Sequence, residues 1–464
     1  MKEIKTVLFL IYHRQQVRNI LRNDAFNAFA NRPNLRIVIL TAKHRVALFQ
    51  KEFGRENVLV EGIEDIPEPF SFLDRFFRHL SFFYVDTKLV RHNRKRFILA
   101  AGGSRFHFFY AMTGITIVGN LQPLRFFLKF LDRQLIRRKD YHQCFDKYCP
   151  NLVFLPHVSS RFDRAFIRTA RSYGVPSVGM INSWDTIGFA KYPIRGLSDF
   201  LLVHNEIIKE EAMTYLDAKP SRVIPVGMPH FDHYVNHPRS SRESFFKKIG
   251  LDPNKRLLLF APFFDTAWQV VSILQDAIVS GELPRDVQIL VRQHPTKDME
   301  AGDLKLTPGI SVMEKPVTYH EEGEVSYSEI MKEDMEHLAD SLYHSDVTFN
   351  VASTMSIDAA AFDKPIINVA FDGWEERPFY QSVKQFYEES RVHYVPVMQS
   401  GGVRIAHNRD EMITYTKMYL GDPRMDQAGR KKIVEEQCWK LDGKAGQRIF
   451  DFLLRSVNLK THVA

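Results

Sequence analysis

Short apolar segments alternate with amphipathic segments along most of the chain. In its first half, runs of the length of a strand lie at 5–10, 35–40, 57–60, 152–156, 176–181, 200–203 and 223–227. Helical patterns separate some of them, at 16–30, 162–173 and 205–216. Strands buried on both faces read as continuous apolar runs, so this alternation predicts a parallel sheet with helices on both sides.

A polar segment at 230–255 interrupts the pattern, which then resumes. Strands are predicted at 256–262, 287–291, 309–313, 347–351 and 365–369, and helices at 268–279 and 328–343. The predicted fold class is α/β, with two Rossmann-like domains facing across a cleft. We predict an N-terminal acceptor domain at 1–235 with an insertion at about 65–150, a nucleotide-donor domain at 236–440, and a C-terminal helix at 441–464 that returns to the first domain.

Composition narrows the class of protein. Hydrophobic residues make up 45% and charged residues 25% of 464 residues, which is typical of globular chains. The three cysteines are too few for a disulfide framework, and the first apolar run is too short for a signal peptide. No uninterrupted run reaches the length of a membrane-spanning helix. We therefore expect a cytoplasmic protein.

Positive charge is concentrated within the insertion. Residues 71–140 hold ten Arg and four Lys against four Asp, together with fourteen Phe and Tyr. Basic residues interleaved with aromatics favour an anionic membrane surface, here the inner face of the cell membrane. The alternative is a helical layer with Phe in its core and solvated Arg. Nothing in the window resembles a nucleic-acid module, so no nucleic acid is expected.

The strongest candidate chemistry lies in VTFNVASTMSIDAAAFDKPIINVAFD, residues 347–372. Asn350 ends a predicted strand, and Ser353 and Thr354 then begin a helix. Free N–H groups at a helix start can bind phosphate. Asp358, one turn deeper on the same face as Thr354, could accept hydrogen bonds from ribose hydroxyls. An ordinary Ser/Thr N-cap followed by an exposed acid would show the same pattern.

Another strand of this domain ends in VRQHP, residues 291–295. Arg292 and His294 would then lie where a nucleotide diphosphate binds. His294 could donate to a phosphate oxygen and stabilise the charge of the leaving group. A single His after a strand is more often structural, but the nearby helix start in the same sheet favours a donor site.

The first domain offers candidates for acceptor chemistry. Asp185 lies beside Trp184 in MINSWDTIG, residues 180–188, directly after a strand. A carboxylate next to an indole can have its pKa raised enough to act as a general base. The alternative is an Asx-turn residue. His13 and His157 each follow a strand and are candidate acceptor ligands or backup bases.

Neither histidine belongs to a recognisable metal-ligand spacing, and the chain has no Asp-x-Asp. We therefore predict no metal and no cofactor, with cationic side chains and helix N–H groups neutralising the donor.

The C-terminal motifs resemble those of GT-B-fold glycosyltransferases. The greatest similarity is to the branch that includes CDP-glycerol glycerophosphotransferases and bacterial capsule and surface-polysaccharide transferases. These carry a strand-end His-Pro, and a Ser-Ser or Ser-Thr that begins a helix with an Asp four residues later. The matching residues here are His294-Pro295, Ser353-Thr354 and Asp358.

Two further segments carry the resemblance. The family has a Trp-His-Gly-Thr segment whose His is the proposed base, and the comparable residues here are Trp184-Asp185-Thr186, with Asp in place of His. The closing DGKAGQRIFDFL, residues 442–453, is similar to the ending of these transferases.

The resemblance implies an enzyme that moves a sugar from a nucleotide-sugar donor to a hydroxyl of a surface glycan or lipid-linked acceptor. Asp185 would deprotonate the acceptor, while Arg292 and His294 stabilise the departing nucleotide. The alternatives are transfer of an alditol phosphate from a CDP-glycerol-type donor, nucleotide-sugar 2-epimerisation, and a binding protein that kept the fold without activity.

Overall fold

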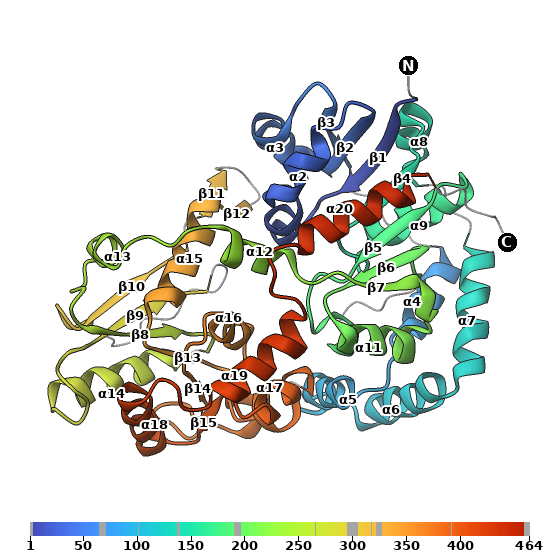
Figure 1. Ribbon diagram of the computed structural model, residues 1–464. Helices are drawn as coiled ribbons and strands as arrows, with labels where there is room; N and C mark the ends of the chain where they lie inside the picture. The colour runs from blue at the N-terminus through green and yellow to red at the C-terminus, as the bar shows by residue number, and fades with distance from the viewer. Residues whose placement is uncertain are drawn as a thin grey trace. The chain divides into compact units, whose positions relative to one another are not determined.

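The chain folds into two compact units. A computed structural model describes residues 3–64, 71–100, 102–136, 140–189, 196–264, 266–294, 305–316, 318–321, 327–390 and 392–458. Unit 1 comprises residues 1–232 and 444–464, and unit 2 comprises residues 233–443 (Figure 1). The sequence placed the corresponding junctions at 235/236 and 440/441.

Unit 1 is built on a parallel sheet with strand order β3-β2-β1-β4-β5-β6-β7. The strands are β1 (Lys5–Leu10), β2 (Leu35–Ala42), β3 (Val58–Ile63), β4 (Leu152–Leu155), β5 (Ser177–Met180), β6 (Phe200–Val203) and β7 (Val223–Pro225). Central strands such as β4 are buried along their whole length. Uninterrupted apolar runs predict such burial on both faces of a strand. The predicted α/β class is confirmed.

Helices cover both faces of this sheet. They are α1 (Arg14–Gln16), α2 (Asp24–Ala30), α3 (Val46–Phe53), α8 (His142–Tyr148), α9 (Arg161–Ser172), α10 (Thr186–Phe189) and α11 (Glu206–Leu216). The helix predicted at 16–30 is interrupted, because a π-helical turn at Val17–Leu21 ends before Asn23, which caps α2. On the face of the sheet opposite α2, Phe145 of α8 packs with Phe166 of α9.

The C-terminal helix α20 (Ala445–Ser456) packs into unit 1, as predicted (Figure 1). Phe450 of α20 contacts Phe29 of α2, with ring centroids 4.9 Å apart. Asp232 accepts hydrogen bonds from the first two N–H groups of α20, at 2.9 and 2.7 Å. Gly446 is required by close approach, because a Cβ there would lie 2.3 Å from Oδ1 of Asn23. These contacts explain the Gly-Lys-Ala-Gly start of the closing segment.

The basic aromatic insertion forms the helices α4 (Phe72–Ser81), α5 (Lys88–Arg94), α6 (Arg105–Asn120) and α7 (Gln122–Leu135). A small apolar core that includes Phe83 and Ile115 joins them. The insertion is anchored by buried Arg125, whose guanidinium pairs with Asp217 at 2.5 Å. Part of the positive charge is therefore buried and ion-paired, whereas the alternative interpretation of the window expected Phe in the core and solvated Arg.

Unit 2 holds a parallel sheet with strand order β10-β9-β8-β13-β14-β15. Its strands are β8 (Arg256–Ala261), β9 (Val287–Arg292), β10 (Ser311–Glu314), β13 (Val347–Asn350), β14 (Ile366–Val369) and β15 (Arg404–Ala406). The helices are α12 (Pro229–Asn236), which crosses the unit boundary, α13 (Arg242–Ile249), α14 (Ala267–Val279), α15 (Lys332–His344), α16 (Met355–Ala361), α17 (Val395–Gln399), α18 (Arg409–Gly421) and α19 (Gln427–Ile433).

One boundary in this unit differs from the prediction. The helix expected from Ser328 begins only at Lys332, because β12 (Tyr327–Ile330) pairs antiparallel with β11 (Thr318–Glu321). β11 and β12 lie close together in the sequence, and their antiparallel pairing overrides the helical pattern at 328–330.

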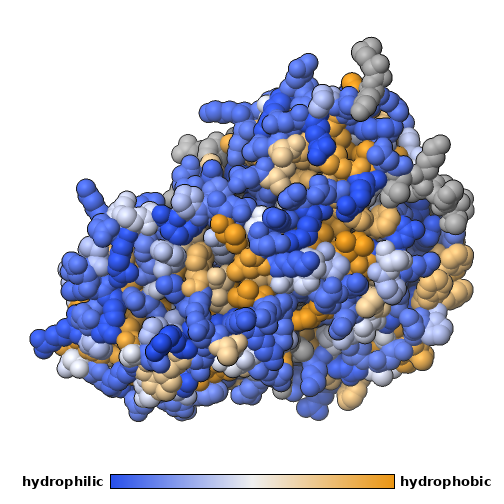
Figure 2. Space-filling view, viewed as in Figure 1, coloured by the Kyte–Doolittle hydropathy of each residue, from blue (hydrophilic) through white to orange (hydrophobic). Residues whose placement is uncertain are grey.

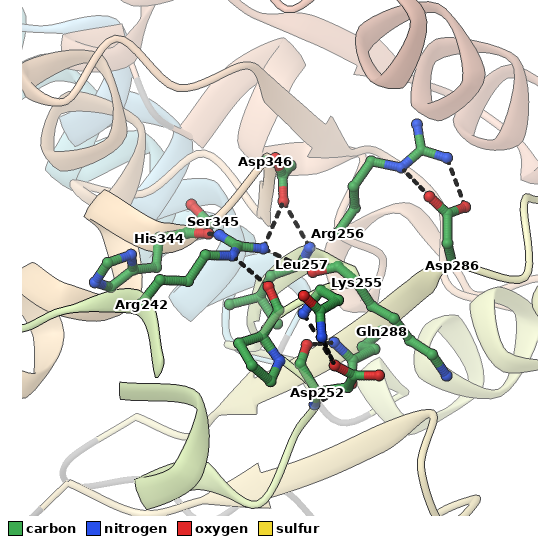
Figure 3. Close-up of polar contacts among 12 residues, drawn as sticks. Arg242, Asp252, Lys255, Arg256, Leu257, Asp286, Gln288, His344, Ser345 and Asp346 are labelled. Atoms are coloured by element: carbon green, nitrogen blue, oxygen red, sulfur yellow. Dashed lines mark hydrogen bonds and ion pairs between the residues drawn. The ribbon is translucent and has the colours of Figure 1, made fainter. Parts of the chain in front are cut away.

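Polar contacts secure the amino-terminal edge of this sheet (Figure 3). Oδ2 of Asp346 accepts from the backbone N–H of Leu257 at 2.7 Å, and Arg242 donates to three backbone carbonyls, those of Pro253, Lys255 and His344. Because this edge is occupied by structural bonds, the carboxyl edge remains the place where unit 2 can receive a ligand.

Candidate functional site

The predicted donor residues of unit 2 line the carboxyl edge of its sheet. From β8 the chain proceeds to β9 on one side, and from β13 to β14 on the other, so the strand order reverses between β8 and β13. Asn350 ends β13, and His294 follows β9, so they lie on either side of β8. Ligands of open α/β sheets bind at such a reversal.

Asn350 is fully buried and organises this edge. Its side-chain oxygen accepts from the N–H of Ser353 at 3.2 Å, the hydroxyl of Ser356 at 3.1 Å and the amide of Asn368 at 3.2 Å. The hydroxyl of Tyr394 completes the network by donating to the Asn368 oxygen at 2.5 Å. Asn350 thus shapes the turn from β13 into α16, while its direct contact with a ligand stays a prediction.

The turn before α16 is braced by its own side chains. Ala352 adopts a left-handed φ of 39°, and its N–H donates to the hydroxyl of Tyr387 at 3.1 Å. The hydroxyl of Ser353 accepts from the N–H of Met355 at 3.0 Å, so it serves the helix start itself. Thr354 is exposed. Phosphate binding by these two hydroxyls stays a prediction.

Asp358 is a buried carboxylate on α16. Its Oδ1 accepts from the hydroxyl of Tyr234, on α12, at 2.9 Å. Burial, with the charge of Asp358 nearby, raises the pKa of the Cys438 thiol. The contact of Asp358 with ribose hydroxyls stays a prediction.

Arg292 is buried and paired with two acids. One guanidinium nitrogen lies 2.7 Å from Glu314, at the end of β10, and the other lies 2.6 Å from Asp334 on α15. Burial would raise the pKa of Glu314, but the hydrogen bond from His337 and the charge of Arg292 lower it. The guanidinium thus joins β9, β10 and α15. Its predicted contact with a diphosphate would compete with these two carboxylates.

His294 is half-buried beside the loop that follows β8. Its ring meets the ring of Phe263 edge-on, with centroids 5.4 Å apart. This contact places the imidazole next to the strand reversal. Pro295, the partner of His294 in the predicted His-Pro, lies outside the described residues.

In unit 1 the structure brings the two candidate histidines together. His13 follows β1 and His157 follows β4, and these strands are neighbours in the sheet. The imidazole centroids are 5.1 Å apart. Burial, and then the neighbouring His157, lower the pKa of His13, while Asp163 opposes them. The imidazole of His13 is therefore held in its neutral form.

Asp185 lies after β5, at the same edge. Its Oδ1 accepts from the hydroxyl of Ser183 at 2.5 Å. Three residues before Asp185, the loop is tied to the one after β1, because Asn182 donates to Gln15 at 2.7 Å. The loops that carry Asp185 and His13 are thus joined at the carboxyl edge of the unit 1 sheet.

Two titratable groups near Asp185 escaped the sequence analysis. Burial, and then the charge of Asp185, raise the pKa of Glu211 to about 7, and Oε2 of Glu211 is buried without a hydrogen-bond partner in the described part of the chain. Burial lowers the pKa of His204 to about 4, although a bond to the Ile181 backbone opposes this. Neither residue stands in a motif, so only burial reveals them.

The profile of one protein family matches most of the C-terminal half. It is described as CDP-Glycerol:Poly(glycerophosphate) glycerophosphotransferase, and it spans residues 193–455, more than half of the chain. The chain belongs to this family of transferases. The matched region contains Arg292, His294 and the segment from Asn350 to Asp358, whereas His13, His157 and Asp185 precede it.

Solved structures resemble the chain over nearly its whole length. The UDP-GlcNAc 2-epimerase of Neisseria meningitidis bound to UDP-GlcNAc is 11% identical with a TM-score of 0.54, covering 97% of this chain and all of the other. The wall teichoic acid polymerase TagF, soaked with CDPG, is 12% identical with a TM-score of 0.53, covering 98% of this chain and 89% of the other. At this identity the likeness establishes the fold.

A curated relative matches a shorter region. The UDP-N,N'-diacetylbacillosamine 2-epimerase (hydrolyzing) of Legionella pneumophila is 24% identical over 181 residues, which are 39% of this chain. The match spans 45% of that relative's length.

Proposed function

We propose that the chain transfers an alditol phosphate, of the glycerophosphate type, from a CDP-activated donor to a hydroxyl of a surface glycan or lipid-linked acceptor. The carrying observation is the family match over residues 193–455, which includes the predicted donor residues at the strand reversal of unit 2. This match favours the alditol phosphate over the sugar donor that the motifs first suggested.

Unit 2 supplies the proposed donor site. Asp358 takes the ribose, and the turn from β13 into α16 lies against the phosphates. His294 donates to the leaving phosphate, whose charge grows in the transition state. Unit 1 supplies the acceptor site, where a base removes the proton of the attacking hydroxyl. Asp185 and the histidine pair are the candidates for this base.

A donor panel tests the proposal. Thermal shift with CDP, CDP-glycerol, UDP, UDP-GlcNAc and GDP should give the largest rise in Tm for the cytidine ligands, because a ligand of the native state stabilises it. CMP release from CDP-glycerol should then depend on a short synthetic oligo(glycerol phosphate) acceptor. We propose a metal-independent reaction, so release should persist in EDTA. No rise in Tm with cytidine nucleotides would contradict the CDP-activated donor. Loss of CMP release in EDTA that Mg²⁺ restores would contradict the metal-independent reaction.

A second candidate is nucleotide-sugar 2-epimerisation. It is favoured by the 24% identity to the Legionella 2-epimerase. An epimerase converts UDP-GlcNAc without an acceptor, whereas a transferase needs one. Product analysis of UDP-GlcNAc incubated with the protein alone separates the two, since conversion of the free sugar nucleotide would identify an epimerase.

We further propose that the insertion helices contact an anionic membrane surface. Phe106, Phe109 and Phe126 of α6 and α7 are exposed by 82, 66 and 66%. Apolar side chains also gather in Figure 2 at the edge where α7 lies in Figure 1. Exposed basic residues accompany them, among them Arg75, Arg78, Arg105 and Arg133. Exposed aromatics with positive charge match the chemistry of an anionic bilayer.

The contact would be peripheral. Among the described residues, no helix is both long and apolar enough to cross a bilayer. A peripheral position at the inner face of the cell membrane would suit an acceptor that is linked to a lipid.

A further inference from the structure

The histidine pair of unit 1 occupies the strand reversal of its sheet. From β1 the chain proceeds to β2 on one side, and from β4 to β5 on the other, in the order β3-β2-β1-β4-β5. β1 and β4 are paired in parallel, with Phe9 opposite Phe154. The loops after them diverge because they lead to opposite sides of the sheet. His13 and His157 stand in these two loops. A ligand of such a sheet is expected at this position.

His157 is held by a buried acid. Its Nδ1 lies 3.0 Å from Oδ2 of Asp163, which is 2% exposed. A carboxylate can only accept, so Nδ1 carries the proton and Nε2 carries the lone pair. The N–H of Ser159 also approaches Nδ1, but at 3.3 Å it is the longer contact. The same Asp163 oxygen accepts from the N–H of Ser160 at 2.8 Å, at the start of α9, which fixes the carboxylate in place.

A hydroxyl lies beside the ring of His157. Oγ of Ser159 is 2.8 Å from Nε2 and 3.4 Å from Nδ1, so it stands to the side of the ring and off the direction of the Nε2 lone pair. With Nδ1 bonded to Asp163, Nε2 is the atom that would take a proton from an acceptor hydroxyl.

Charged groups around the pair tune its protonation. The anion that faces it is Asp163, on α9, and the cations are Arg14 and Arg45, both near His13. Arg45 is anchored by donating to the Tyr12 carbonyl at 2.6 Å. A neutral His13 does not repel a proton that arrives on His157, whereas a charged His13 would.

We propose that His157 is the general base of the transfer and that Asp163 is its positioning residue. This assignment rests on the proposed function. Nε2 takes the proton of the acceptor hydroxyl while that oxygen bonds to the donor phosphorus. The bond from phosphorus to the nucleotide oxygen breaks, and its electron pair leaves with CMP. The Asp163 carboxylate stabilises the imidazolium, which then returns its proton to water.

His157 is better placed for this role than Asp185. An imidazole has an ordinary pKa close to neutrality, so it can take up and release a proton there without a large shift. The bond to Asp163 also orients the tautomer of His157.

Two substitutions and two comparators test the assignment in the full chain. Asp163→Asn removes the charge that would stabilise the imidazolium, while an amide oxygen in the place of Oδ2 can still accept from the Ser160 N–H and from Nδ1. His157→Gln removes the imidazole. Asp146→Asn is the matched control, because Asp146 is an exposed carboxylate that accepts from the Tyr173 hydroxyl at 2.7 Å. Asp185→Asn tests the competing base.

The main measurement is the pH profile of kcat/KM, with CDP-glycerol and a short synthetic oligo(glycerol phosphate). We expect wild type and Asp146→Asn to lose activity as pH falls, because a protonated imidazole cannot act as a base. Asp163→Asn and His157→Gln should lower kcat/KM by about 100-fold to 10,000-fold, the range of general-base catalysis. His157→Gln should also lose the acid limb, whereas Asp163→Asn, which keeps the imidazole, should retain it. If Asp185→Asn removes the limb while His157→Gln keeps both rate and limb, the assignment is overturned.

A measurement without activity tests the dyad separately from the proposed function. In protein with ¹⁵N-labelled histidine, neutral His157 should carry its proton on Nδ1. A wild-type His157 protonated on Nε2 would overturn the positioning role, whatever donor the protein uses.

Discussion

At the residue scale, single buried carboxylates carry the sharpest consequences. Asp358 combines a structural bond to Tyr234 with its proposed ribose contact, and Glu211 is buried close to Asp185. In both cases an isosteric amide separates charge from shape, because it keeps the volume of the side chain and removes its ionisation.

Asp358→Asn should weaken CDP binding by about 1–3 kcal/mol, the cost of losing hydrogen bonds to a charged acceptor. The amide oxygen can still accept from Tyr234, so Tm should change little. Calorimetric titration with CDP measures the first effect and thermal unfolding the second. Tyr234→Phe is the matched control, since it should lower stability by about 1 kcal/mol and spare affinity. Wild-type affinity in Asp358→Asn would remove the ribose role.

Glu211 should make stability depend on pH. Its pKa is raised to about 7 from 4.5, so between these values the folded state binds more protons than the unfolded state. The free energy of unfolding therefore falls as pH rises through this window. Glu211→Gln should be more stable than wild type by about 1–3 kcal/mol at pH 8, and equal to it near pH 4.5.

Thermal unfolding across pH 4.5–8 checks this prediction, with the adjacent exposed Glu210→Gln as control. A constant difference between Glu211→Gln and wild type at every pH would show that the carboxyl is not desolvated.

At the element scale, an ion-paired arginine joins three elements of unit 2. Arg292 ends β9, Glu314 ends β10, and Asp334 lies in the first turn of α15. An Arg in this position serves packing even when it also serves a ligand, so loss of activity in a variant does not by itself show donor binding.

Arg292→Met should lower stability by about 3–5 kcal/mol, because it removes the guanidinium that pairs with buried Asp334, while Glu314 keeps its bond to His337. Arg256→Met is the matched control, since Arg256 pairs with Asp286 at the exposed amino-terminal edge of the same sheet. It should cost about 1 kcal/mol or less. Denaturant unfolding of both variants makes the comparison. Equal, small losses would mean that Arg292 is not needed for packing and would strengthen its predicted donor role.

At the scale of the whole molecule, the exposed aromatics of the insertion should govern membrane attachment. Phe106→Ser with Phe126→Ser should reduce flotation with phosphatidylserine vesicles, because the inserted rings supply the apolar part of binding. Each nearby Lys or Arg adds about 1 kcal/mol, so binding should also weaken toward 1 M salt.

Val279→Ser is the control, since Val279 is 58% exposed in unit 2, away from the insertion in sequence. It should float as wild type does, and thermal shift with CDP should be the same in all variants. Equal flotation of wild type with neutral and anionic vesicles would show that the aromatic helices do not recognise a charged surface.

The sequence alone predicted the α/β class, two parallel sheets and the return of the C-terminal helix, but not β15 (Arg404–Ala406). Apolar runs such as 152–156 and 347–351 favour strands buried on both faces, so local pattern and global fold agree. It also located the candidate site residues at strand ends, since the carboxyl edge of a parallel sheet follows from strand direction.

Only the tertiary structure decided which partner each of these residues meets. Arg292 pairs with acids 22 and 42 positions away, and Glu211 meets the charge of Asp185 across two helices. Such contacts depend on how elements pack, which periodicity does not encode. Asp163 was nearer to prediction, because Ser160-x-x-Asp163 is a capping pattern directly after a strand. Its bond to His157 depends on how α9 packs beside the loop that follows β4. The capping carboxylate is buried there, and it therefore also meets the imidazole.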